Sequence, residues 1–111
     1  MRIMLKSKIR NVKINDACIK YEGSITIDKR LMKLADIVPY EQVHVLDVTN
    51  GKRFVTYAIE GNDGDICVNG AASLLVNIGD EVTILAYGIV QRYASLVPKV
   101  INGQTFKSTA S

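Results

Sequence analysis

A glycine followed by a serine, at the start of a predicted strand, is the feature of this sequence with the clearest chemical potential. Gly23 and Ser24 lie in the run 20–28, whose last five residues alternate polar and apolar side chains like a half-buried strand. Gly23 lacks a Cβ, so the peptide bond to Ser24 is sterically open. A serine hydroxyl beside such a bond can attack the preceding carbonyl carbon if the surroundings strain it. The same local pattern also fits an ordinary Gly-Ser turn that leads into a strand.

Two further groups of residues could bind or protonate a small anionic substrate. Arg53 and Tyr57 are four residues apart in a predicted strand, so they share a face and lie about 13 Å apart. Both could line one groove, whereas Thr56 points to the other face unless a bulge turns it. Residues 69–72 (Asn-Gly-Ala-Ala) begin a predicted helix and could offer backbone N–H groups to an anion. The alternative is an exposed arginine and a tyrosine at the edge of the core.

The charge distribution is consistent with an anion site near the N-terminal end. The 111-residue chain has a net charge of +3, but residues 1–23 alone carry +4. This excess indicates either a solvated strand face or a site for a small anion. Cys18, Cys67 and the single His44 lack metal-ligand spacing, so we expect buried reduced thiols and no metal site. No apolar run has membrane-spanning length and no signal-peptide core is present, which predicts a cytoplasmic protein.

The elements that must position these side chains follow from the hydrophobic pattern. The chain length predicts a single domain over residues 1–111. Asp28 is expected to cap a short helix over residues 29–35, with Leu31, Leu34 and Ala35 on one face. An Asn-Gly hairpin turn is predicted at residues 49–52. Strands are predicted in a long or bent segment over residues 3–14, over 21–27, 41–48, 53–59 and 66–69, and weakly after Pro98.

A weak internal repeat suggests how these elements are arranged. Residues 66–69 mirror residues 25–28, 41 positions earlier, and each run precedes a short helix, a turn and a strand. Two like strand-helix-strand units, residues 25–48 and 66–88, predict a mainly β fold, a barrel with pseudo-twofold symmetry. Ser24 and residues 69–70 would then occupy related places.

Five runs of residues carry specific motifs, in this order along the chain: Met4-Leu5-Lys6-Ser7-Lys8-Ile9, Tyr21-Glu22-Gly23-Ser24-Ile25-Thr26-Ile27-Asp28, Asn50-Gly51-Lys52-Arg53-Phe54-Val55-Thr56-Tyr57-Ala58-Ile59, Val68-Asn69-Gly70-Ala71-Ala72 and Val76-Asn77-Ile78-Gly79-Asp80. Together they resemble the pyruvoyl-dependent aspartate decarboxylase family. The resemblance covers roughly residues 1–88, and the tail over residues 91–111 is unlike the family.

The resemblance implies a double-psi β-barrel with short helices, a homotetramer, and active sites where neighbouring subunits meet. It also implies that Ser24 is the precursor of a pyruvoyl cofactor. The Ser24 hydroxyl would attack the carbonyl of Gly23, and the chain would separate into residues 1–23 and 24–111. Thr56 would assist this acyl shift, and Asn69 would help to hold the cleavage loop. Whether a maturation partner takes part stays open.

The resemblance also implies how L-aspartate would become β-alanine and CO₂ for pantothenate and coenzyme A synthesis. The aspartate amine would condense with the pyruvoyl ketone as a Schiff base, which accepts the electrons left by CO₂. Lys8 and Arg53 would hold the substrate carboxylates, and Tyr57 would protonate the carbon that lost CO₂. Residues 70–72 (Gly70, Ala71 and Ala72) would keep that wall small and offer backbone donors.

Two departures from the family and two other functions have to be considered. Arg10 stands where the family commonly has histidine, and Leu46 where tryptophan is frequent, which concerns rate or maturation more than reaction type. A small basic β-barrel that binds nucleic acid is one alternative, although aromatic residues, which stack on single strands, are only 6% of the chain. The other alternative is a homologue that never cleaves and acts as a binding subunit.

Overall fold

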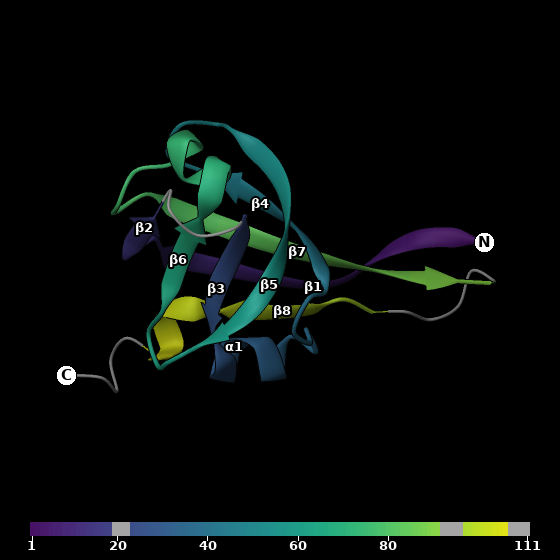
Figure 1. Ribbon diagram of the computed structural model, residues 1–111. Helices are drawn as coiled ribbons and strands as arrows, with labels where there is room; N and C mark the ends of the chain where they lie inside the picture. The colour runs from purple at the N-terminus through teal and green to yellow at the C-terminus, as the bar shows by residue number, and fades with distance from the viewer. Residues whose placement is uncertain (19–22, 92–96, 107–111) are drawn as a thin grey trace.

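The computed structural model describes residues 1–18, 23–91 and 97–106, and these residues form mainly β-strands (Figure 1). The short helical segments are α1 (Lys29–Leu34) and two 3₁₀ turns, η1 (Gly70–Leu75) and η2 (Gly103–Phe106). The mainly β architecture is as predicted. The strands are β1 (Arg2–Lys13), β2 (Asp16–Cys18), β3 (Ser24–Asp28), β4 (Gln42–Asp47), β5 (Arg53–Gly61), β6 (Ile66–Asn69), β7 (Glu81–Val90) and β8 (Lys99–Asn102).

The strands close into a barrel because the first segment pairs on both sides. They follow the order β2-β6-β3-β5-β4-β7-β1-β8. Only Ile14 and Asn15 separate β1 from β2, and their N–H groups donate to the carbonyls of Asp80 (3.0 Å) and Ile66 (2.9 Å). Since β1 pairs with β7 and β2 pairs with β6, this nearly continuous segment joins the two sides of the sheet.

The barrel contains the two strand-helix-strand units that the repeat predicts. They are β3-α1-β4 and β6-η1-β7, and β3 and β6 pair antiparallel with each other. Each central strand also pairs in parallel with the strand that precedes the other unit, β3 with β5 and β6 with β2. This crossed parallel pairing is the double-psi arrangement that the family resemblance implies.

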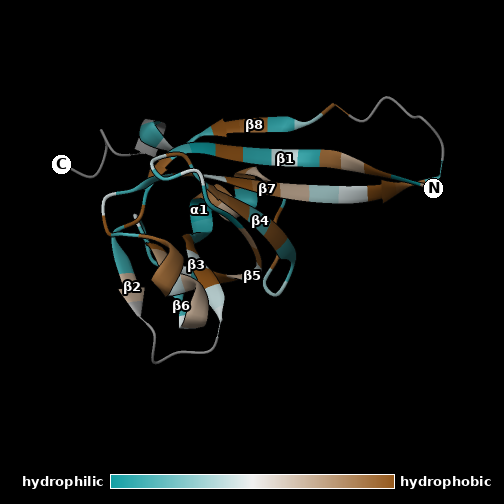
Figure 2. Cartoon of the chain, turned by 90° about the horizontal axis from the view of Figure 1, so that it is seen from above, coloured by the Kyte–Doolittle hydropathy of each residue, from teal (hydrophilic) through white to brown (hydrophobic). Residues whose placement is uncertain are grey.

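Alternate side chains of the barrel strands build one core, and the hydropathy alternates along β1 in Figure 2. The predicted buried face of α1 is partly wrong. Leu31 and Ala35 are buried, but Leu34 is 47% exposed and Met32 takes its place in the core. Of the predicted strand over residues 21–27, residues 21 and 22 lie outside the described part of the chain. The same holds for the side chain of Cys18 and for residues 107–111.

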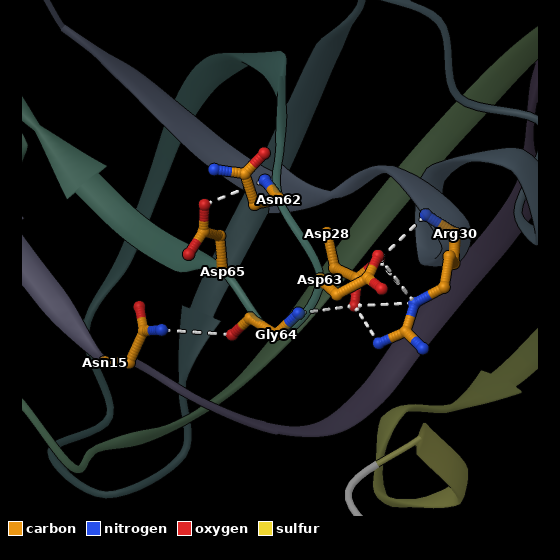
Figure 3. Close-up of polar contacts among 7 residues, drawn as sticks. All are labelled: Asn15, Asp28, Arg30, Asn62, Asp63, Gly64 and Asp65. Carbon is orange, nitrogen blue, oxygen red and sulfur yellow. Dashed lines mark hydrogen bonds and ion pairs between the residues drawn. The ribbon is translucent and has the colours of Figure 1, made fainter. Parts of the chain in front are cut away.

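Asp28 caps α1 as predicted and also ties the helix to the β5–β6 turn (Figure 3). Its Oδ1 accepts the backbone N–H of Arg30 at 2.8 Å, and its Oδ2 accepts Arg30 Nη2 and the N–H of Gly64, both at 2.8 Å. Burial alone would raise the pKa of Asp28, but these hydrogen bonds outweigh it and lower the pKa. The C-terminal end of β3 is thereby anchored, opposite the end that carries Ser24.

A buried pair of carboxyl groups holds the hairpin that leads into Arg53. Asp47 Oδ1 accepts the N–H groups of Thr49 (2.9 Å) and Asn50 (3.1 Å), and the Asp47 side chain is 1% exposed. Its Oδ2 meets no N–H or O–H donor among the described residues and interacts with Asp80. Burial, followed by the hydrogen bond with Asp80, raises the pKa of Asp47, and the same hydrogen bond lowers the pKa of Asp80. Burial beside Asp80 therefore favours the protonated form of Asp47.

Asp47→Asn should raise the free energy of unfolding at neutral pH by about 1 kcal/mol, because the amide supplies an N–H donor toward Asp80 without needing a proton. The raised pKa of Asp47 contributes to the free energy of unfolding. This contribution is complete below pH 3.8 and is lost as pH rises through the folded-state pKa of Asp47. The lowered pKa of Asp80 also contributes to the free energy of unfolding, and this contribution is complete above pH 3.8 and is lost in acid. The advantage of the variant should therefore grow as pH rises from 3.8 through the folded-state pKa of Asp47.

Urea unfolding at several pH values measures this advantage. Asp36→Asn, at an exposed position, is the matched control and should follow the parent at every pH. An Asp47→Asn variant whose difference from the parent is constant over this pH range would contradict the raised pKa of Asp47.

Candidate active site

Ser24 lies at the first position of β3, on the face of the strand that points away from the core. Ile25 and Ile27 belong to the core, so the alternation of side chains places Ser24 and Thr26 on the opposite face. The antiparallel register of β3 and β6 pairs Ser24 with Asn69. Ser24 is nevertheless only 3% exposed.

The Asn69 side chain connects the two strands at this point. Its Nδ2 donates to Ser24 Oγ at 3.0 Å and to Thr26 Oγ1 at 3.0 Å. Cys67 Sγ donates to Asn69 Oδ1 at 3.2 Å, and Asn69 is 5% exposed. We call these four residues, Ser24, Thr26, Cys67 and Asn69, the Asn69 network. Asn69 thus contacts the serine oxygen directly, and its role in holding the cleavage loop stays a prediction.

Thr26 and Cys67 were missed as site residues by the sequence analysis. The period of two along a strand already places Thr26 beside Ser24 and Cys67 beside Asn69. What was missing is the register between β3 and β6, which brings the two pairs together. Cys67 was expected to be a buried thiol, but it is half-buried and donates to Asn69.

Asn69 precedes η1 in the chain, but its side chain does not cap this helix. Its side chain makes no cap hydrogen bond to η1, because the amide is turned toward β3. Gly70 has φ = 73°, a conformation that favours glycine, and this residue turns the chain from β6 into η1. Ala71 and Ala72 follow Gly70 directly in the chain. Ala71 is exposed and Ala72 is half-buried. Gly23 is exposed, and a Cβ added to it would meet no atom within 4 Å.

Tyr57 lies on the strand next to Ser24. The first pair in the parallel register of β3 and β5 is Ile25 with Ala58. Ser24 immediately precedes Ile25, and Tyr57 immediately precedes Ala58. Tyr57 is half-buried, and its ring centroid lies 6.2 Å from that of Tyr40. A groove of about 480 Å³ is lined by Tyr40, Gln42, Val55, Thr56 and Tyr57. Thr56 therefore also lines this groove, although the alternation of side chains along the strand predicts that Thr56 and Tyr57 face opposite sides.

The two predicted carboxylate-binding cations do not lie beside Ser24 within one chain. Arg53 is exposed at the start of β5, opposite Leu46 of β4. Lys8 is half-buried on β1, where it pairs with Leu85 of β7. In the sheet order, β4 and β7 stand between β5 and β1. The single chain thus brings together Ser24 and Asn69, with Tyr57 on the neighbouring strand, whereas the strand of Lys8 pairs with neither β3 nor β6.

Each of the two departures from the family lies close in the sheet to one of these cations. Arg10 is on β1, two residues after Lys8, where it is exposed and pairs with Asn102 of β8. Leu46 is half-buried and lies opposite Arg53 in the β4–β5 register. Neither residue belongs to the Asn69 network. Among the described residues, no helix is long and apolar enough to cross a membrane, and the cytoplasmic location stays a prediction.

Comparisons with known proteins identify the family to which this chain belongs. The aspartate decarboxylase family model matches residues 1–108. An aspartate 1-decarboxylase of Dehalococcoides mccartyi is 54% identical over 96 residues, which cover 85% of this chain and 77% of the relative. An aspartate 1-decarboxylase of Thermoanaerobacter pseudethanolicus is 52% identical over 104 residues, which cover 90% of this chain and 89% of the relative. Among solved structures, a rationally designed protein has a TM-score of 0.46 at 19% identity, with 74% of this chain and 91% of that chain covered. From the family match and these relatives, the chain belongs to the aspartate decarboxylase family.

Proposed function

We propose that this chain cuts itself between Gly23 and Ser24 and then converts L-aspartate to β-alanine and CO₂, a step toward pantothenate and coenzyme A. Membership of the family and the names of its relatives support the decarboxylation. The observation that carries the self-cleavage is the contact at Ser24. Its hydroxyl is 3% exposed, follows a glycine, and has an oxygen that accepts an N–H from Asn69.

The cleavage requires no reagent besides water. Ser24 Oγ attacks the carbonyl carbon of Gly23, the C–N bond breaks, and the hydroxyl proton ends on the Ser24 nitrogen, so an amide becomes an ester. Loss of the Ser24 Hα and rupture of the Cβ–Oγ bond then release the Gly23 carboxylate and leave dehydroalanine. Hydrolysis releases ammonia and leaves a pyruvoyl group at the start of residues 24–111. Thr56, which lines the neighbouring groove, is assigned to assist the shift.

The residues present fit a pyruvoyl group at position 24. The Gly23 side is sterically open, so the cut end can leave, and Asn69 Nδ2 supplies a hydrogen-bond donor beside position 24. A bound pyruvoyl group supplies the electron sink that no ordinary side chain offers when CO₂ leaves an amino acid.

The other assigned residues bind the substrate or move a proton. Arg53 and Lys8 bind the aspartate carboxylates, and the planar guanidinium of Arg53 suits a bidentate contact. Tyr57 donates a proton to the carbon that loses CO₂. Residues 70–72 offer backbone N–H groups and, with two alanines, leave room for a small substrate.

The proposed active unit is a homotetramer in which neighbouring chains complete each site. Two observations support this proposal. Lys8 lies on β1, which pairs with β7 and β8 and not with β3 or β6, the strands that carry Ser24 and Asn69. Large apolar side chains are also exposed around the barrel, among them Val55 (55%), Leu74 (71%) and Ile89 (69%).

Intact mass after prolonged warming tests the proposal. The parent should give two fragments, residues 1–23 and 24–111, and the larger should begin with a carbonyl group in place of an amine. The cleaved protein should release CO₂ from L-aspartate and have a tetramer mass by light scattering. A single 12.2 kDa species without activity would favour a homologue that never cleaves. Salt-sensitive binding of DNA or RNA by that species would favour the nucleic-acid alternative.

A further inference from the structure

The Asn69 network contains two residues for which the proposed function assigns no role. Thr26 Oγ1 accepts from Asn69 Nδ2 at 3.0 Å, and Cys67 Sγ donates to Asn69 Oδ1 at 3.2 Å. Together with the contact to Ser24, both ends of the Asn69 amide are engaged. Because Asn69 is 5% exposed, water has little access to replace these partners.

These contacts determine which end of the amide faces Ser24. The oxygen and nitrogen ends of an asparagine have nearly the same shape, so hydrogen-bond partners decide its orientation. Hydroxyl groups such as those of Ser24 and Thr26 can accept or donate and fit either end. The Cys67 thiol donates to the oxygen end, and a flipped amide would instead direct an N–H at sulfur, a weak acceptor. The thiol therefore favours the orientation in which the N–H side faces Ser24.

This orientation suits a serine oxygen that must act as a nucleophile. During attack Ser24 Oγ gives up its proton, and an N–H pointing at Oγ stabilises the negative charge that develops there. A flipped Asn69 would instead present its carbonyl oxygen and accept the hydroxyl hydrogen, which stabilises the un-ionised serine. The rate of the acyl shift should therefore depend on how firmly the amide is held.

We infer that Cys67 and Thr26 are positioning residues for self-cleavage, which hold the Asn69 amide with its N–H side toward Ser24. The inference rests on the proposed function and deepens it. Neither residue touches the substrate in this role. Both act through Asn69, Cys67 at its oxygen and Thr26 at its nitrogen.

Cleavage rates of four variants test the inference, with the uncut fraction followed by denaturing mass spectrometry. Cys67→Ala should cleave about 10-fold more slowly than the parent, the kinetic equivalent of one lost hydrogen bond. Cys67→Ser keeps a donor and should cleave within about 2-fold of the parent. Thr26→Val, which preserves shape but removes the acceptor, should be slower by about 5-fold. Thr83→Val removes a half-buried hydroxyl from β7, outside the Asn69 network, and should match the parent.

The serine rescue separates a positioning role from a packing role. Parental cleavage in Cys67→Ala would overturn the inference, and so would equally slow cleavage in Cys67→Ala and Cys67→Ser, which would point to lost packing of the sulfur. Melting temperatures of the uncleaved variants should agree within a few degrees. A parent that does not cleave between Gly23 and Ser24 removes the proposed function itself, whereas a cleaving parent with unaffected variants removes only the positioning roles.

Discussion

Ser24→Ala should remain a single uncut chain without decarboxylase activity, however long it is warmed. The substitution removes the only atom that can attack the Gly23 carbonyl in the proposed acyl shift, so neither the ester nor the new N-terminus can form. Folding should survive, since Ser24 lies outside the hydrophobic core and the loss of its hydrogen bond with Asn69 costs about 1 kcal/mol. Denaturing mass spectrometry and CO₂ release from L-aspartate measure the two outcomes.

A matched serine substitution shows whether the effect is local. Ser73→Ala, at a half-buried position in η1 and outside the Asn69 network, should cleave and turn over like the parent. The Ser24→Ala chain should unfold cooperatively, with a melting temperature near that of the uncut parent. Detecting residues 24–111, or β-alanine, in preparations of Ser24→Ala would remove Ser24 from its assigned role.

Tyr57→Phe should cleave normally but decarboxylate about 10²–10⁴-fold more slowly, the usual worth of a positioned general acid. The proposed acyl shift does not use the phenol, so maturation and turnover should separate in this variant. The ring can keep its packing beside Tyr40, because only the hydroxyl is removed. The loss should appear mainly in kcat, since proton donation acts after aspartate is bound.

Arg53→Ala provides the contrast, because it removes a proposed partner of a substrate carboxylate. This variant should raise KM more than it lowers kcat. Both variants must be assayed as fully cleaved protein, with the cleaved fraction measured by mass. A near-parental kcat in cleaved Tyr57→Phe would show that water or another group in the groove donates the proton.

Much of the local structure could be predicted from the sequence. The pattern over residues 53–59 predicted strand β5, Asp28 predicted the start of α1, and Asn50-Gly51 predicted the hairpin between β4 and β5. The order and spacing of the motifs indicated the family. These features depend on residues close together in the chain, where side-chain period, caps and turn residues act directly. The Gly23–Ser24 pair is likewise a feature of residues that are adjacent in the chain.

Local pattern was insufficient where a residue had two possible partners. Leu34 has the spacing of a buried helix residue, yet α1 packs so that Met32 is covered and Leu34 is 47% exposed. Asn69 has the position of a helix cap, but its amide bonds to Ser24 and Thr26 on the neighbouring strand. In both cases a tertiary contact competes with the local one and prevails.

The sequence by itself determined most of the strands, though not β2, together with the cap of α1 and the presence of a serine after a sterically open glycine. Only the tertiary structure decided that Cys67 and Thr26 meet Asn69, that burial beside Asp80 favours the protonated form of Asp47, and that Lys8 lies on a strand that does not pair with that of Ser24. These contacts depend on pairing between strands distant in the chain. One residue of register shift between β3 and β6 would turn the Asn69 side chain to the opposite face from Ser24, and no short-range pattern specifies that register.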